Sequence, residues 1–311
     1  MKKRFYTKKK KIRKGKKLFF FLMFVLGLYL SFILIDQTKI EITDKKIVSL
    51  LLQESNFIEK ESTISDILKN ILSNYKNPTN LLLTKQTKET IKQQPSKVTE
   101  KDPQTSSPLI YIYNSHQTEE YAPSSFLEYD LKPTVMVASY ILEDVFNKNN
   151  LNTIVEERKI KDILNQNNWK YNYSYKASRI YLEDVIATNS SLEYFIDVHR
   201  DSLSKEKTTV EINGKSYAKT IFLIGLENPD YEKNLSLAEK INNKINERYP
   251  NLSKGIYKKG GPGVNGVYNQ DFSPNTILIE IGGKDNTTSE VLNSTLAFAE
   301  CFMEVINENE G

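Results

Sequence analysis

The sequence predicts an α/β domain over residues 108–311, with a mixed, mostly parallel sheet and helices on both faces. Two observations lead to this fold class. Short apolar runs typical of strands alternate with segments in which apolar residues recur about every 3.6 positions, as in amphipathic helices. The region holds about 200 residues, a reasonable length for one domain with a substantial core.

The expected elements follow in order along the chain. Strands are expected at 109–113, 152–155, 194–198 and 276–281, and helices at 134–146, 171–186, 231–249 and 289–306. Segments 208–212 and 217–224 flank Asn213-Gly214, a dipeptide that suits the positive-φ positions of a tight hairpin turn. Open α/β sheets bind ligands at the C-terminal ends of their strands, so we expect the functional site there.

Both histidines of the chain stand at the end of a predicted strand. His116 follows the first strand, His199 follows the third, and Glu280 lies within the last. Neutral imidazoles are common metal ligands, and a catalytic zinc takes three protein ligands and leaves a fourth position for water. The pattern predicts a zinc site in which Glu280 acts as general base, because a carboxylate in so apolar a strand is costly without a purpose.

Three blocks around these residues, 111–121, 197–202 and 279–283, resemble the signature blocks of the stage II sporulation protein P family, peptidoglycan hydrolases of spore-forming bacteria. The resemblance covers residues 108–311. This family is a distant relative of the zinc-dependent N-acetylmuramoyl-L-alanine amidases, which share a His, Glu, His ligand set and a catalytic Glu near the C-terminal end. It implies amidase activity, action on peptide cross-links as well, and a partnership with stage II sporulation protein D and other engulfment proteins.

The resemblance leaves the third zinc ligand open between two residues. Glu119 matches the acidic position of the family's His-x-x-Glu-x-Tyr block and is our first choice, whereas the related amidases place their ligand nearer Glu128. Arg200 is a candidate for holding a substrate carboxylate or a developing oxyanion, and Asp201 for orienting Arg200 or a ligand imidazole, although the two could equally form a structural ion pair. Tyr121 is a candidate substrate contact.

The N-terminal region predicts a membrane anchor. Residues 1–17 hold 11 lysines and arginines and no acidic residue, and 18–35 form an uncharged run that spans about 27 Å as a helix. A cleaved signal peptide is the alternative, but no small-residue cleavage site follows the run. We expect a single-pass protein of the cell membrane with a cytoplasmic N-terminus, bound to lipid through 18–35, and an extracytoplasmic remainder. Residues 36–84 are expected to form a partly helical juxtamembrane stalk and 85–107 a disordered linker.

The charge distribution and the single cysteine exclude other classes of function. The basic tail accounts for the positive net charge of +4, so the folded part is net acidic and has no basic face for nucleic acid. Cys301 cannot form an internal disulfide, and its apolar neighbours in a helical pattern indicate a core position.

Two functions from different classes remain in view. The first is a membrane-anchored zinc amidase of peptidoglycan. The second is a non-catalytic envelope scaffold that binds peptidoglycan or partner proteins. The presence of Glu280 together with both histidines favours the enzyme, because a scaffold needs no group that handles protons.

Overall fold

We describe the protein from a computed structural model, which describes residue 23 and residues 43–55, 107–126 and 129–309. The chain divides into two compact units, Met1–Ile42 and Thr43–Gly311. No helix among the described residues is long and apolar enough to cross a membrane. Apart from Met23 and the last residue of the linker, the predicted tail, anchor and linker lie outside the described residues. Glu128 and residues 36–42 and 56–84 of the predicted stalk lie outside them as well.

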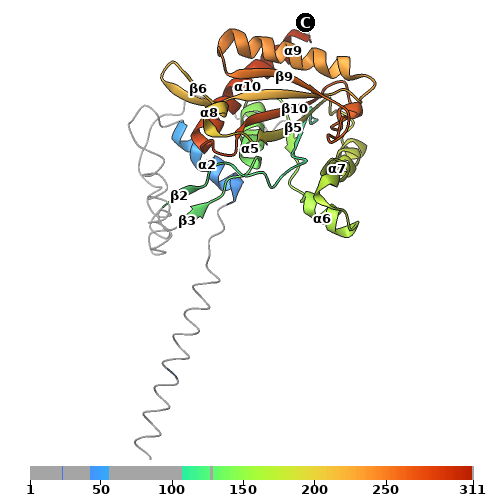
Figure 1. Cartoon of the computed structure of the whole chain (residues 1–311), viewed down its shortest axis with the longest axis horizontal. Coiled ribbons are helices and arrows are strands. Elements are labelled where there is room, and N and C mark those ends of the chain that lie inside the picture. The colour runs from blue at the N-terminus through green and yellow to red at the C-terminus, as the bar shows by residue number, and fades with distance from the viewer. Residues whose placement is uncertain (1–22, 24–42, 56–106, 127–128, 310–311) are drawn as a thin grey trace, which may run out of the picture. The chain divides into compact units, whose positions relative to one another are not determined.

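Six strands form the central sheet of the larger unit, in the order β4-β1-β5-β10-β8-β9. Figure 1 labels β5, β10 and β9 of this sheet. Their bounds are β1 Ile110–Tyr113, β4 Thr153–Val155, β5 Tyr194–Asp201, β8 Thr220–Gly225, β9 Ser253–Lys259 and β10 Thr276–Gly283. Strands β4, β1, β5 and β10 are parallel, β8 runs antiparallel to β10, and β9 is parallel to β8. The prediction of a mixed, mostly parallel sheet is confirmed.

Helices pack on both faces of this sheet, because successive side chains of a strand point to opposite faces. Along β5, Ile196 and Val198 belong to a large apolar cluster with α5 (Met136–Lys148), α9 (Tyr231–Arg248) and α10 (Thr288–Asn309). Phe195 faces the other way, into a second cluster with Leu182 of α7 (Ser174–Thr188). Because side chains in a strand alternate between faces, Asp197 and His199 share the α7 face of the sheet with Phe195.

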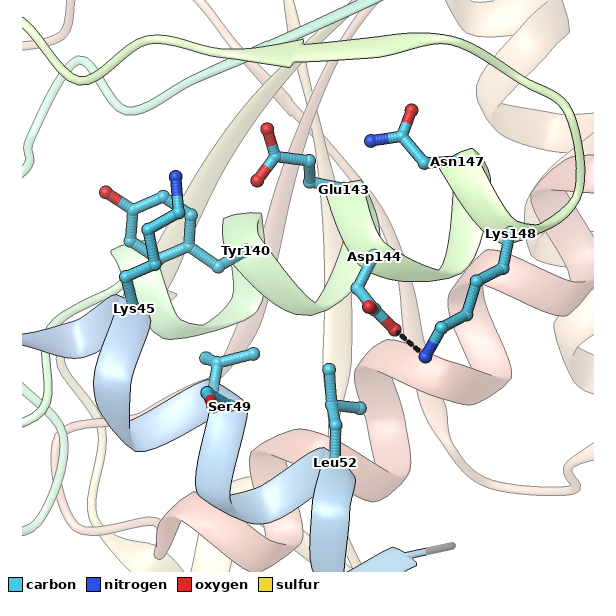
Figure 2. Close-up of a pocket in the computed structure, with 9 residues that line it drawn as sticks. Lys45, Ser49, Leu52, Tyr140, Glu143, Asp144, Asn147 and Lys148 are labelled. Atoms are coloured by element: carbon cyan, nitrogen blue, oxygen red, sulfur yellow. Dashed lines mark ion pairs between the residues drawn. The ribbon is translucent and has the colours of Figure 1, made fainter. Parts of the chain in front are cut away.

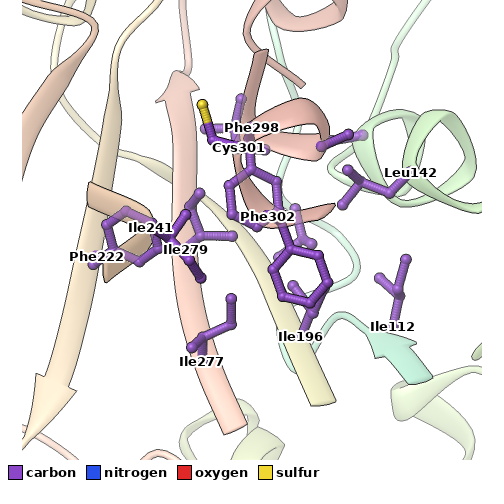
Figure 3. Packing of buried hydrophobic residues seen from close by; sticks show 14 of the residues in the cluster. Ile112, Leu142, Ile196, Phe222, Ile241, Ile277, Ile279, Phe298, Cys301 and Phe302 are labelled. Carbon is purple, nitrogen blue, oxygen red and sulfur yellow. The ribbon is translucent and has the colours of Figure 1, made fainter. Parts of the chain in front are cut away.

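The large cluster forms the core of the domain. Figure 3 shows Phe298 and Phe302 of α10 beside Ile279 and Ile196 of the sheet. Cys301 lies in the same cluster with no exposed surface, which confirms its expected core position. Burying aromatic side chains of this size contributes about 1.5 to 3 kcal/mol each, so this layer fixes the positions of the central strands.

The predicted hairpin forms, but its second strand is shorter than expected. β6 (Thr209–Ile212) and β7 (Lys215–Ala218) pair in antiparallel fashion, and Asn213 and Gly214 take positive φ angles of 51° and 75°. The run predicted at 217–224 breaks at Lys219, after which the chain enters the main sheet as β8. Every residue of β8 is buried, whereas β7 is largely exposed, so one continuous apolar run supplies two different sheets.

Several short or half-exposed elements give little sequence signal and were not predicted. These are β9, the helix α6 (Ile160–Gln166), the ribbon of β2 (Ser124–Phe126) and β3 (Tyr129–Leu131), α8 (Lys205–Thr208) and the single turn η2 (Gln270–Phe272). The helix predicted at 171–186 forms as the turn η1 (Tyr171–Tyr173) followed by α7. Strand β9 forms one end of the sheet order and carries four residues that are Lys or Ser, so it lacks a clear apolar pattern.

Helix α2 (Asp44–Ser55) packs against α5, although it precedes the predicted domain (Figure 2). Its apolar residues Ile47, Val48 and Leu51 are buried. At its first residue, the Asp44 carboxylate accepts hydrogen bonds from the Thr134 backbone N–H at 3.0 Å and from the Thr134 hydroxyl at 2.6 Å. Thr134 immediately precedes the first turn of α5, so Asp44 ties the start of one helix to the start of the other.

This contact predicts a measurable loss of stability on truncation. Asp44→Ala should lower the free energy of unfolding by about 1 to 3 kcal/mol, the range for hydrogen bonds to a charged group. Lys46→Ala, an exposed position on the same helix, is the matched control. Urea denaturation of the purified chain measures both, and equal midpoints for the two variants would show that α2 is not held by this contact.

Candidate metal centre

The parallel strands bring the predicted site residues to one edge of the sheet. β5 pairs with β1 on one side and with β10 on the other, so all three strands end at the same edge. His116 lies in the loop after β1, His199 lies near the end of β5, and Glu280 lies near the end of β10. Glu280 and His199 are direct partners in the register, so they project from the same face of neighbouring strands about 4.8 Å apart.

His116, Glu119 and His199 form a cluster suited to a metal ion, because one ligand atom from each lies within 4.8 Å of the others. The Glu119 carboxylate faces both rings: Oε1 lies 3.5 Å from His116 Nδ1, and Oε2 lies 3.4 Å from His199 Nδ1. The two rings approach edge to face, with centroids 4.9 Å apart. Two imidazoles and a carboxylate that leave an open side are the donor set of a catalytic zinc, so the residues present fit that ion.

Local backbone geometry explains how Glu119 reaches the histidines. The Glu119 N–H donates to the His116 carbonyl at 3.0 Å, so one turn of chain returns its side chain toward the ring of His116. The Glu119 carbonyl in turn accepts from the Val135 N–H at 2.9 Å, which anchors the loop to the start of α5. The N–H of Arg200 donates to Glu119 Oε2 at 3.1 Å and fixes the carboxylate beside β5.

Asp197 orients the His199 ring from the side away from Glu119, a role that the sequence analysis missed. Its Oδ1 lies 3.0 Å from His199 Nε2, and its carboxylate accepts hydrogen bonds from the Ser115 backbone N–H at 2.9 Å and hydroxyl at 2.8 Å. Asp197 has no exposed surface, so this arrangement is rigid. A signal was available: Asp197 lies two residues before His199 in a strand, hence on the same face, and is the one acid within the apolar run 194–198.

Aromatic rings complete the wall around the histidines. The ring of Tyr171 stacks on His116 at 5.1 Å between centroids, and Tyr175 packs edge-on against His116 at 5.2 Å. Tyr175 also stacks with His199 at 6.1 Å. The turn η1 and the first residues of α7 therefore form one side of the cluster.

The other predicted site residues have different surroundings. Arg200 donates from Nε to the Glu120 carbonyl at 2.9 Å and from Nη1 to the Asp201 carbonyl at 3.3 Å. The Asp201 carboxylate pairs with Lys254 at 3.1 Å and not with the Arg200 guanidinium, and the aspartate in contact with the His199 ring is Asp197.

Tyr121 is placed in the core and not at the surface. Only 2% of the residue is exposed, and its hydroxyl donates to the Ile281 carbonyl at 2.9 Å. The aromatic ring fills the space between the Glu119 loop and β10, so it supports the strand that carries Glu280 and offers substrate no surface. Its place next to Glu119 and Glu120 in the sequence gave no indication of this burial.

The charges of the cluster shift the pKa values of its members. Burial alone would lower the pKa of His199, but the Asp197 and Glu119 carboxylates outweigh it and raise that pKa to about 10. Burial would raise the pKa of Glu119, yet hydrogen bonds from His116 and His199 hold it well below its usual range. For Glu280, burial and the nearby negative charge of Asp201 together raise the pKa above its ordinary value. Glu119 is thus a permanent anion, and Glu280 holds a proton more readily than an ordinary glutamate.

Comparison with known proteins identifies the family of this chain. The α/β sheet with a His, Glu, His cluster at its C-terminal edge defines a candidate metal-dependent domain. Residues 34–303 match the family model of stage II sporulation protein P, and the chain belongs to that family. It is 36% identical over 203 residues to stage II sporulation protein P of Bacillus subtilis (strain 168), an alignment that covers 63% of this chain. The chain spans about half of that relative's length, 51%.

Three solved structures are similar to this chain, and two of them are amidases. They are the N-acetylmuramoyl-L-alanine amidase AmiC2 of Nostoc punctiforme (10% identity, 64% of this chain and 97% of that chain, TM-score 0.38) and the CwlD amidase from Clostridioides difficile in complex with the GerS lipoprotein (13% identity, 64% and 98%, TM-score 0.41). Cwp6 from Clostridium difficile aligns with 12% identity over 65% of this chain and 30% of that chain, with a TM-score of 0.41.

The raised pKa of His199 predicts that zinc binding depends on pH. A proton on Nδ1, the nitrogen that faces Glu119, must leave before a cation takes that lone pair. The protonated fraction grows as the pH falls below about 10. The zinc affinity of the purified chain should therefore fall about tenfold per pH unit between about pH 8 and about pH 6, as measured by competition with a chelator. An affinity independent of pH across this range would remove His199 from the ligand set.

Asp197 predicts a second effect on zinc. Asp197→Asn removes the negative charge behind the His199 ring and should weaken zinc binding about 10- to 100-fold, the usual effect of losing an outer carboxylate. Asp201→Asn is the matched control, since that carboxylate pairs with Lys254 and not with a histidine. Zinc affinities that fall equally in both variants would contradict a specific role for Asp197.

Proposed function

We propose that this chain is a zinc-dependent amidase that hydrolyses the N-acetylmuramoyl-L-alanine bond of peptidoglycan, with the ion held by His116, Glu119 and His199. Membership of the stage II sporulation protein P family supports a sporulation-related function on peptidoglycan. The observation that carries the catalytic part is the register of β10 with β5, which sets the Glu280 carboxylate beside the His199 ligand.

The metal site and Glu280 have separate roles in amide hydrolysis. A zinc ion at this site would lower the pKa of a water molecule to about 7 and polarise the amide carbonyl. Glu280 takes the proton of the attacking water and then delivers it to the leaving nitrogen, as a general base turned acid. No hydrogen bond or ion pair engages its carboxylate among the residues that the structure describes, so it is available for both transfers. Its raised pKa suits the second one.

Arg200 and the tyrosines position the substrate in this proposal. Two donors of Arg200 bind the backbone carbonyls of Glu120 and Asp201, and the remaining N–H groups are those that a developing oxyanion or substrate carboxylate would meet. Tyr171 is half exposed and stacks on His116, so its outer face is open to a sugar or peptide group.

A non-catalytic scaffold is the second candidate function. Nothing in such a protein requires a half-buried carboxylate with a raised pKa beside a His, Glu, His cluster, since burial of that group costs stability. We therefore favour the enzyme.

The cellular setting is also a proposal. The anchor at 18–35 would place the domain outside the membrane, where peptidoglycan lies, and action on peptide cross-links and cooperation with stage II sporulation protein D follow from the family resemblance. The chain spans about half of its curated relative, so these properties of the whole protein need their own tests.

Mass spectrometry of sacculi digested with the purified chain tests the proposal. The wild-type chain should release stem peptides with a free alanine amino terminus, and a chelator should abolish this release. Glu280→Gln keeps size and hydrogen bonding but removes the basic group, so turnover should fall on the order of 10² to 10⁴-fold while the zinc content stays near one equivalent. Undiminished hydrolysis in this variant would contradict the mechanism, and loss of zinc would make Glu280 a ligand.

A further inference from the structure

A pocket of about 480 Å³ lies next to His116, between the loop that follows β1 and the helix α6. Its volume is in the range of small-ligand sites. Apolar side chains of Met136, Ile160 and Leu164 line it, together with the polar residues Gln117 and Thr118. This combination of an apolar lining and a few polar groups is typical of sites that bind an extended organic ligand.

The pocket and the metal cluster share the same loop and the same aromatic wall. Tyr171 lines the pocket and stacks on His116. Gln117, the residue after His116, donates from Nε2 to the Arg158 carbonyl at 2.8 Å and accepts from the Ile160 N–H at 2.8 Å. Both ends of its amide are used, so α6 is fixed to the loop. The residues on both sides of His116, Ser115 and Gln117, therefore line the pocket.

Two acidic and two basic side chains line the pocket, and among the described residues only the acids have hydrogen-bond or ion-pair partners. Of the two acids, Asp44 is hydrogen-bonded to Thr134 and Glu157 forms an ion pair with Lys45 at 2.8 Å. The two lysines, Lys159 and Lys161, are exposed, and within the described part of the chain their ammonium groups have neither an ion pair nor a hydrogen bond. Two free cations above an apolar floor are complementary to a ligand with a carboxylate.

We propose that this pocket binds the stem peptide of the substrate, with Lys159 and Lys161 holding the carboxylate of its acidic second residue. The inference rests on the proposed amidase function, because the alanine amide must lie at the cluster. An extended chain advances about 3.5 Å per residue, so a residue two positions from the cleaved bond lies about 7 Å away, outside the cluster itself. The lysines are then positioning residues for an acidic peptide and are not catalytic.

Binding of defined ligands tests this subsite apart from catalysis. The full-length chain carrying Glu280→Gln is titrated with N-acetylmuramoyl-L-alanyl-D-glutamate whose γ-carboxylate is blocked as an amide, which leaves the α-carboxylate as its one anionic group, and with the same compound amidated at the α-carboxylate as well. We expect Lys159→Gln combined with Lys161→Gln to weaken binding of the free acid about tenfold and to leave the amidated ligand unchanged, with the difference shrinking at high salt. Lys170→Gln, an exposed lysine outside the pocket, should bind both ligands as the parent does.

The outcomes separate the subsite from the reaction. Equal binding of acid and amide by the parent, an unchanged affinity for the acid in the double lysine variant, or no binding of either ligand would overturn the subsite. A parallel assay follows hydrolysis of the free acid by the chain with Glu280 intact. Lysine-dependent binding without hydrolysis would uphold the subsite and overturn the proposed reaction, whereas hydrolysis without lysine-dependent binding would overturn the subsite alone.

Discussion

In-register parallel pairing of β5 with β1 and with β10 is the constraint on which the candidate site depends. It aligns the ends of three strands, so that residues more than 80 positions apart in the sequence meet at one edge. The pairing is held by the apolar layer beneath it, in which Ile196 and Ile279 pack against Phe302. A slip of one residue in either pair would turn His199 or Glu280 to the opposite face, because strand side chains alternate.

Negative charge around His199 is the second determinant of the site. Asp197 lies on one side of the ring and Glu119 on the other. The Asp197 carboxylate accepts a hydrogen bond from the Ser115 backbone N–H, and the Glu119 carboxylate accepts one from the Arg200 backbone N–H. Burying such a group of acids is unfavourable unless a cation neutralises them. A proton on His199 serves that purpose in the metal-free chain, and a divalent cation would serve it better. The cluster therefore favours a bound cation, and Glu280, the register partner of His199, lies close to it.

The sequence was sufficient for those features that depend on periodicity and on residue type. Alternation of strands and helices predicted the mixed sheet, and Asn213-Gly214 predicted the hairpin turn. His116, His199 and Glu119 were predicted as one group, and the structure brings them together.

The features that the sequence did not predict depend on three-dimensional packing. Tyr121 was expected to contact substrate, but its ring is enclosed by elements that are distant in the sequence. Asp197 was passed over because an acid inside a strand has no local sign of its partner, and helix α2 was assigned to a stalk because its docking surface on α5 is not visible in its own sequence.

Diffraction from crystals of the zinc-loaded chain, recorded on both sides of the zinc absorption edge, locates the metal directly. We predict one anomalous peak at about 2.0 to 2.2 Å from a ring nitrogen of His116, a ring nitrogen of His199 and a carboxylate oxygen of Glu119, with Glu280 nearby but not bound. A peak elsewhere in the domain, or one in which another residue replaces Glu119, would contradict it.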